Sequence, residues 1–294
     1  MSFDKRVVEV IRQRFSCRTY GEEPIAETAR QRLAAAASAA TQGPLGTPAR
    51  FALVSATEED RRALRGLGTY GFIRGATGFI VGAAGAGLRY LEDWGYRMEE
   101  LILVATDLGL GTCWLGGSFT RSSFERKLGL HQGEEMPAVA AVGHIAERRA
   151  LTDRFIRRQA RARTRLPWEK LFFRRGFGAP LTAAEAGPYA TPLEMVRIGP
   201  SASNKQPWRI VQKDDAWHFF LQRTPNYAAN RDYGVIRISD LQRVDIGIAM
   251  CHFELTAREL GLAGNWTVQE PTLVKPDTRT VYVVSWVCQE RSSP

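Results

Sequence analysis

The stretch around which this chain is organised is residues 200–208, PSASNKQPW. Pro200 and Pro207 block a regular helix, and the serines and asparagine between them bend the backbone through their own side chains. An apolar pattern of helical spacing precedes the stretch over 193–198, and a strand-like run follows over 208–211. A polar loop between two rigid elements is typical of a binding site.

Composition limits the class of protein. The 294 residues suffice for one large domain or two ordinary ones, and 44% hydrophobic with 24% charged residues is typical of a soluble globular protein. No apolar run approaches the ~20 residues of a membrane helix, and no signal segment follows the first residues. Four scattered cysteines and four isolated histidines argue against a disulfide scaffold or a metal site and favour a cytoplasmic protein.

The net charge of +9 is unevenly distributed, because eight arginines crowd residues 148–165. Such a run could bind nucleic acid. However, Phe155 is its only aromatic residue, and no known nucleic-acid-binding motif accompanies it. We therefore expect a linker that includes a few phosphate-binding arginines, with a small-molecule substrate and neither nucleic acid nor membrane as partner. Nucleic-acid binding stays open as an alternative.

Hydrophobic periodicity predicts a chain of mixed helices and strands. The expected helices are 4–14, 25–40, 58–66, 90–108, 122–128 and 193–198, and the expected strands are 51–55, 79–81, 138–143 and 208–211. The long helix should stop at Gly109, since glycine favours helix ends. Residues 109–117, GLGTCWLGG, are predicted to be a glycine-rich loop.

The long helix and the segment after it recur at an offset of 152 positions (245 minus 93). The matching pairs are Asp93/Asp245, Gly95/Gly247, Met98/Met250, Leu103/Leu255, Ala105/Ala257, Leu108/Leu260, Gly109/Gly261, Leu110/Leu262 and Trp114/Trp266. A second match relates 48–51 to 207–210 at an offset of 159. We therefore predict two α+β halves, 1–165 and 166–294, that together form one compact unit.

The two copies differ where polar residues matter. At the positions of Asn204 and Gln206 the first half has Leu45 and Thr47. Conversely, the second half has RRGFG at 174–178 in place of the first half's spaced Arg-x-Ser-x-Arg at 14–18. Each half retains the motif that the other half lacks. This pattern predicts a fused homodimer in which only one of the two original binding sites survives.

Together these motifs resemble the nitroreductase family of flavoproteins, in particular its single-chain branch with two fused halves. The similarity rests on Arg-x-Ser-x-Arg after the first helix, the loop 200–208, the glycine-rich 109–117 and a basic pair at 163 and 165, and it covers essentially the whole chain. It implies an α+β nitroreductase-like fold, with two pseudo-repeated halves forming an intramolecular pseudo-dimer. Each half would be a central, mostly antiparallel sheet flanked by helices, and a monomer would suffice.

This resemblance also implies a function. An FMN-dependent oxidoreductase would pass electrons from NAD(P)H to a nitroaromatic, a quinone or a similar small acceptor by ping-pong hydride transfer. The alternative is a flavin-binding protein without turnover: a sensor, a carrier or a degenerate paralogue. No side chain is expected to be catalytic, although the backbone of Gly117 would lie near flavin N5.

Thirteen residues carry the implied FMN site. The phosphate would be bound by Arg14, Ser16, Arg163 and Arg165, and the ribityl chain and the N1/O2 edge by Arg18. One face of the ring would be lined by Trp114, Leu115, Gly116 and Gly117. The second half would contact the ring and the ribityl chain through Pro200, Ser201, Ala202 and Asn204. Asn204 could instead only cap a turn, and the register of the two arginines is open. Gly116 stands where the family often has an acidic residue, and Ala202 where it has a second serine.

Overall fold

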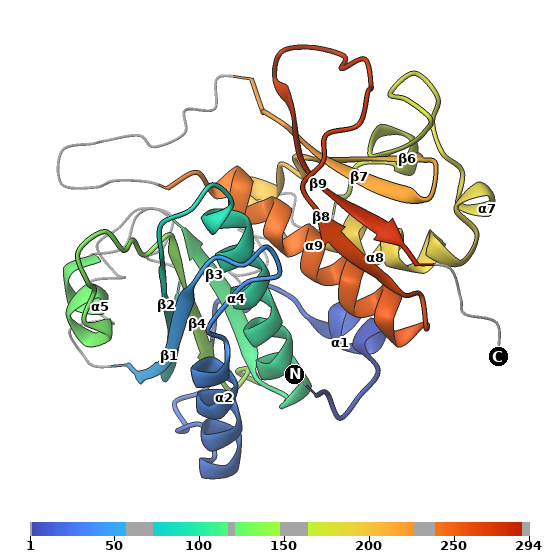
Figure 1. Ribbon diagram of the computed structural model, residues 1–294. Helices are drawn as coiled ribbons and strands as arrows, with labels where there is room; N and C mark the ends of the chain where they lie inside the picture. Colours follow the sequence, from blue (N-terminus) through green and yellow to red (C-terminus); the bar gives the residue numbers. More distant parts are fainter. Residues whose placement is uncertain (1, 57–72, 117–120, 148–163, 226–238, 290–294) are drawn as a thin grey trace.

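The computed structural model describes residues 2–56, 73–116, 121–147, 164–225 and 239–289 (Figure 1). The α-helices are α1 (Val7–Gln13), α2 (Glu27–Ala39), α4 (Tyr90–Asp107), α5 (Arg121–Leu128), α7 (Ala183–Ala186), α8 (Ala190–Ile198) and α9 (Leu241–Glu259). The strands are β1 (Ala49–Ser55), β2 (Gly78–Ala84), β3 (Gly111–Gly116), β4 (Ala138–Gly143), β5 (Phe172–Arg174), β6 (Trp208–Lys213), β7 (Ala216–Gln222), β8 (Gly264–Thr267) and β9 (Thr280–Cys288). The short 3₁₀ turns are η2 (Trp168–Lys170), η3 (Gly187–Tyr189) and η4 (Ala202–Asn204).

Two separate sheets indicate two halves. The first has the order β1-β2-β4-β3 and is antiparallel throughout. The second has the order β5-β6-β7-β9-β8 and is antiparallel except where the short β5 pairs parallel with β6. Apart from β5, the two strand orders correspond one to one. The predicted fold class of helices with mostly antiparallel sheets is therefore confirmed.

The long helices α4 and α9 lie side by side between the two sheets (Figure 1). A Cβ atom on Gly95 of α4 would lie 2.5 Å from the carbonyl oxygen of Val244, and one on Gly247 of α9 would overlap the carbonyl oxygen of Glu92. The two contacts are equivalent under the repeat, because Gly247 corresponds to Gly95 and Val244 corresponds to Glu92 at the offset of 152. The helix contact is therefore reciprocal, as in an isologous interface.

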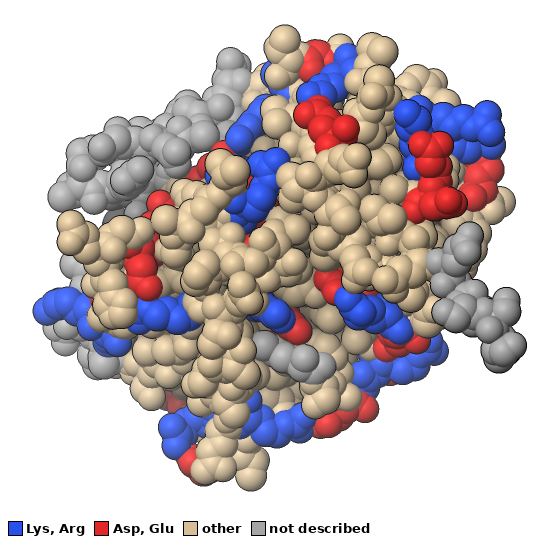
Figure 2. All heavy atoms as spheres, viewed as in Figure 1, with Lys and Arg blue, Asp and Glu red and all other residues tan. Residues whose placement is uncertain are grey.

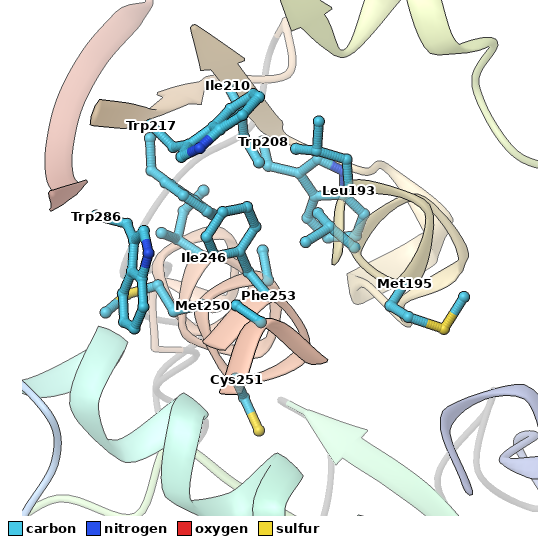
Figure 3. Close-up of a cluster of buried hydrophobic side chains, with 14 of the residues drawn as sticks. Leu193, Met195, Trp208, Ile210, Trp217, Ile246, Met250, Cys251, Phe253 and Trp286 are labelled. Carbon is cyan, nitrogen blue, oxygen red and sulfur yellow. The ribbon is translucent and has the colours of Figure 1, made fainter. Parts of the chain in front are cut away.

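The hydrophobic cores cross from one half to the other. The largest cluster packs Trp208, Trp217, Phe253 and Trp286 between α8, α9 and the second sheet (Figure 3), and it also takes in the apolar face of α1. The second cluster lies between α2, α4 and the first sheet and takes in Val244 and Ile248 of α9. Because each core contains a helix from the other half, burial of apolar surface holds the halves together.

One predicted element is wrong. Residues 109–117 were expected to be a loop, but Gly111–Gly116 form β3, paired with β4 along its full length. Gly109 does end the helix, with φ of 80°. The four residues between the flanking glycines, TCWL, fit a pleated and half-buried surface, and this preference outweighs the cost of the glycines. The predicted helix 58–66 lies outside the described residues.

Charges on the described surface are mixed. On the face shown in Figure 2, Lys and Arg side chains lie beside Asp and Glu side chains rather than in one basic patch. Most of the arginine-rich segment, 148–163, lies outside the described residues. Among the helices that the structure describes, none is long and apolar enough to span a bilayer.

Candidate functional site

The segment after α1 runs along β3. The amide of Cys17 donates to the carbonyl of Thr112 at 2.8 Å, and Ser16 pairs with Thr112 in a parallel bridge. A Cβ atom on Gly111 would lie 2.9 Å from the Sγ and Cβ of Cys17, so this close passage needs glycine. The predicted Arg-Ser-Arg motif is thereby fixed against the strand that carries Trp114.

A buried carboxylate joins two of the predicted site residues. Glu99 of α4 is fully buried, and its Oε2 accepts from Trp114 Nε1 at 2.7 Å. The guanidinium of Arg14, whose side chain is only 6% exposed, lies with Nε 3.7 Å from Glu99 Oε1. Arg14 and Trp114, 100 positions apart, are thus oriented by one acidic side chain that sequence reasoning missed.

The backbone of Arg18 is joined to that of Arg74. The amide of Arg74 donates to the carbonyl of Arg18 at 2.9 Å, and the amide of Tyr20 donates to the carbonyl of Arg74 at 2.8 Å. The parallel bridge pairs Arg74 with Thr19, so the side chains of Arg18 and Arg74 leave opposite faces of the two extended segments.

The loop 200–208 has a strained backbone that hydrogen bonds keep in place. Ser203, Asn204 and Gln206 have φ of 50°, 53° and 50°, a region that residues other than glycine rarely adopt. Each such residue costs on the order of 1 kcal/mol. The Gln206 amide donates to Ser201 Oγ at 2.9 Å and helps to hold this shape. Strain that the surroundings maintain is commonest at functional sites.

An aspartate at the start of each long helix holds the loop of its own half. Oδ1 of Asp245 accepts from the Ala202 amide at 2.9 Å, and Asp93 accepts from the amides of Leu45 and Thr47, each at 2.7 Å. Burial raises the pKa of both carboxyl groups, that of Asp245 well above its usual range. The repeated Asp93/Asp245 pair therefore has an equivalent structural role.

Asn204 connects the loop to the predicted basic pair. Its Oδ1 accepts from Arg165 Nη1 at 3.0 Å, and its Nδ2 donates to the carbonyl of Thr164 at 2.8 Å. Arg165 Nη2 also donates to the carbonyl of Ile198 at the end of α8. The structure thus brings Arg165 and Asn204 together, and part of the role of Asn204 is structural.

Three arginines influence one another at this point. Burial and, to a smaller extent, the nearby charges of Arg14 and Arg197 together lower the pKa of Arg165 to about 10. Arg165 remains charged at neutral pH and lies near Arg14 at the end of α1, whereas Arg197 at the end of α8 is paired with Glu194 at 2.6 Å. Like charges at close range favour a site for an anion.

The other predicted residues have different surroundings. Leu115 is fully buried in the core cluster on the far side of β3, so its side chain cannot face a ligand there. Trp114 and Gly116 are half-buried on the opposite face. A Cβ atom on Gly116 would lie 2.6 Å from Leu241 Cδ1 of α9. Pro200 and Ser201 are half-buried, whereas Gly117 and Arg163 lie outside the described residues.

These features define an α+β protein of two sheets with a cationic site where segments of both halves meet. The chain belongs to the family described as "Putative TM nitroreductase", whose model matches residues 6–257. The resemblance to nitroreductases inferred from the motifs is therefore confirmed.

One solved structure has the same fold over nearly the whole chain, and others are similar to about half of it. A "putative nitroreductase" from Thermotoga maritima covers 98% of this chain and 95% of its own, with 17% identity and a TM-score of 0.61. A "putative nitroreductase in complex with FMN" from Desulfovibrio desulfuricans covers 51% of this chain and 95% of its own, at 25% identity and a TM-score of 0.39. A "nitroreductase with bound FMN" from Bacteroides fragilis covers 50% and 92%, at 18% identity and a TM-score of 0.37. A search of the curated proteins found no match.

Proposed function

We propose that this protein is an FMN-dependent oxidoreductase of nitroreductase type, with NAD(P)H as electron donor and a small nitroaromatic or quinone as acceptor. The observation that carries the proposal is the contact of Arg165 with Asn204 of the loop, at 3.0 Å, with the positive charge of Arg14 nearby. The charge of Arg14 lowers the pKa of Arg165, so a bound anion would relieve a repulsion that the fold maintains. Arginine is well suited to this role, because its forked donors match phosphate geometry.

The residues present fit FMN. Arg14, Ser16 and Arg165 would hold the phosphate, and the loop 200–204 would approach the ribityl chain and the ring from the second half. Trp114 and Gly116 present one face of β3 to the same region. When bound, FMN would take a hydride from reduced nicotinamide and pass two electrons to the acceptor by ping-pong turnover. Arg18 would supply positive charge as the ring becomes reduced.

We also propose that the chain is an intramolecular pseudo-dimer with one flavin site. The reciprocal contacts of Gly95 and Gly247 and the matching strand orders support this arrangement. In the first copy of the loop, Leu45 packs against the hydrophobic core and Thr47 is buried. That copy therefore lacks the polar groups that Asn204 and Gln206 supply, and a monomer would be complete.

Flavin binding tests the proposal directly. Purified protein, or apoprotein to which FMN is added, should show a flavin absorption spectrum with one FMN per chain. Riboflavin, which lacks the phosphate, should bind much more weakly if Arg14 and Arg165 are the anchor. A protein that takes up no FMN would refute the proposal, and two FMN per chain would refute the single site.

A flavin-binding protein without turnover is the second candidate. The contact of Gly116 with Leu241 favours it, because a side chain at the position that often carries an acid in the family would first have to displace the side chain of Leu241. Reduction by NADH or NADPH distinguishes the two. We expect anaerobic NAD(P)H to bleach the flavin and a quinone to restore its colour; a loaded protein that neither nucleotide bleaches would favour the second candidate.

A further inference from the structure

A buried hydrogen-bonded pair crosses from α4 to α9 beside the proposed site. Nε2 of His252 lies 2.9 Å from Oε1 of Glu99, and both side chains are fully buried. Nδ1 of His252 lies 2.9 Å from the carbonyl oxygen of Met195 on α8. The contacts thus run without a gap from Arg14 and Trp114, through Glu99 and His252, to α8.

Hydrogen-bond chemistry fixes the protons in this pair. A backbone carbonyl only accepts, so Nδ1 of His252 must carry a proton. Nε2 then faces a carboxyl oxygen, and their hydrogen bond requires one proton on one side or the other. Trp114 Nε1, which only donates, occupies the second oxygen of Glu99. Both oxygens of Glu99 are therefore engaged, and its orientation is set by two different elements.

The far end of the pair lies at the start of the loop 200–208. Gly199 follows α8 directly, and a Cβ atom there would lie 3.4 Å from Nδ1 of His252 and 2.9 Å from the carbonyl oxygen of Val196. The carbonyl of Ile198 accepts from Arg165. His252 thus packs against the point where the loop leaves its helix.

Stability alone is a weak explanation for this pair. Two buried polar groups can often be replaced by apolar side chains of similar size without loss of stability, because the desolvation cost offsets their attraction. The pair is also one-sided. At the offset of 152, Cys251 stands in the place of Glu99 and Glu100 in the place of His252.

We propose that Glu99 and His252 are positioning residues that keep the two half-sites in register, Glu99 by orienting Trp114 and Arg14, and His252 by fixing the start of the loop at Met195 and Gly199. This inference rests on the proposed function. The pair touches no ligand itself; it sets the distance between the β3 side of the site and the loop side.

A double variant separates positioning from stability. Glu99→Leu combined with His252→Leu replaces the pair by apolar side chains. We expect a lower thermal unfolding midpoint, because the Arg14 guanidinium and Trp114 Nε1 lose their acceptor, so FMN binding is measured well below the midpoint of the variant. FMN should nevertheless bind about tenfold more weakly, the loss typical of one hydrogen bond to a charged group. The matched control is Glu254→Gln, since Glu254 is also buried on a long helix and accepts from Trp266 Nε1 at 2.6 Å. That control should bind FMN as the wild type does.

Measurements on apoprotein keep the test independent of flavin. In Glu99→Gln, nuclear magnetic resonance should show shifts of both the Trp114 indole N–H and the Gly199 backbone amide, because His252 connects them. Unchanged FMN affinity in the double variant, or an unmoved Gly199 amide in Glu99→Gln, would overturn the inference. If wild-type protein binds no FMN, the proposed function fails, whereas the Gly199 signal still reports on the pair.

Discussion

Arg50 and Glu134 form a bidentate ion pair that ties β1 to the segment before β4. Arg50 Nε donates to Glu134 Oε1 at 2.9 Å, and Nη2 approaches Oε2 at 2.5 Å. The same guanidinium donates to the carbonyls of Leu128 and Gly129 after α5. One side chain therefore holds together a strand, a helix end and a turn.

This pair predicts a specific acid sensitivity. Arg50 lowers the pKa of Glu134 from 4.5 to about 2. A carboxyl group with a lowered pKa stabilises the fold above its unfolded pKa, and this contribution is lost as the pH falls from 4.5 through 2. Because the pair is partly exposed, we expect Glu134→Gln to reduce the free energy of unfolding at pH 7 by only about 1 kcal/mol.

The measurement is denaturant unfolding of wild type and variant between pH 7 and pH 2. The difference between them should shrink as the pH falls, because the wild type loses the same interaction. Glu22→Gln, in an exposed turn, is the control. A difference that persists unchanged at pH 2 would contradict the assignment to this ion pair.

The glycine contact between the long helices predicts a severe effect of one methyl group. In Gly247→Ala the new Cβ would overlap the carbonyl oxygen of Glu92 and lie 2.7 Å from the amide of Tyr96. The helices must separate, so we expect a loss of about 3 kcal/mol in the free energy of unfolding. Gly176→Ala, where nothing lies within 4 Å, should change stability little. The free energy of unfolding of both variants is measured by urea denaturation. Equal values for Gly247→Ala and Gly176→Ala would contradict the prediction, because they would show that α4 and α9 accommodate the methyl group.

Much of the fold could be predicted from local patterns. The apolar spacing of residues 90–108 predicted a helix that the structure gives as Tyr90–Asp107, and the predicted strand 138–143 is β4. Both segments are buried, so their positions are occupied by apolar residues at the spacing of a helix or a strand. β3 was missed because its glycines suggested a loop, whereas its pairing partner β4 lies over twenty residues further along the chain.

Residue types and spacing alone predicted the candidate site only as separate motifs, the loop 200–208 and the residues Arg14 and Arg165. That these motifs meet was expected only from the family resemblance, because it depends on how the two halves pack. Glu99 and His252 lie 153 positions apart, each on a helix whose local pattern is ordinary. Contacts of this kind follow from tertiary packing and leave no periodic signal.

Thiol reactivity should follow burial. Cys17, Cys113 and Cys251 are 2%, 5% and 0% exposed, whereas Cys288 is half-buried. Burial raises the pKa of Cys251 well above its usual range and also raises that of Cys288, so little thiolate is present at pH 8. Native protein should react with a disulfide reagent at Cys288 alone, and more slowly than a free thiol. Cys288→Ser should abolish this phase; fast reaction of a second thiol without denaturant would contradict the packing.

If Arg14 binds the FMN phosphate, a positive charge alone at position 14 should not be sufficient for full FMN affinity. Arg14→Lys keeps the positive charge but loses the fork, so FMN should bind about tenfold more weakly, while riboflavin, which has no phosphate, should bind as it does to the wild type. Arg174→Lys is the matched control, because Arg174 pairs with the exposed Glu185 in the second half. Titration of flavin fluorescence measures both ligands on both variants. Equal losses for FMN and riboflavin would place Arg14 away from the phosphate, and unchanged FMN binding would remove it from the site.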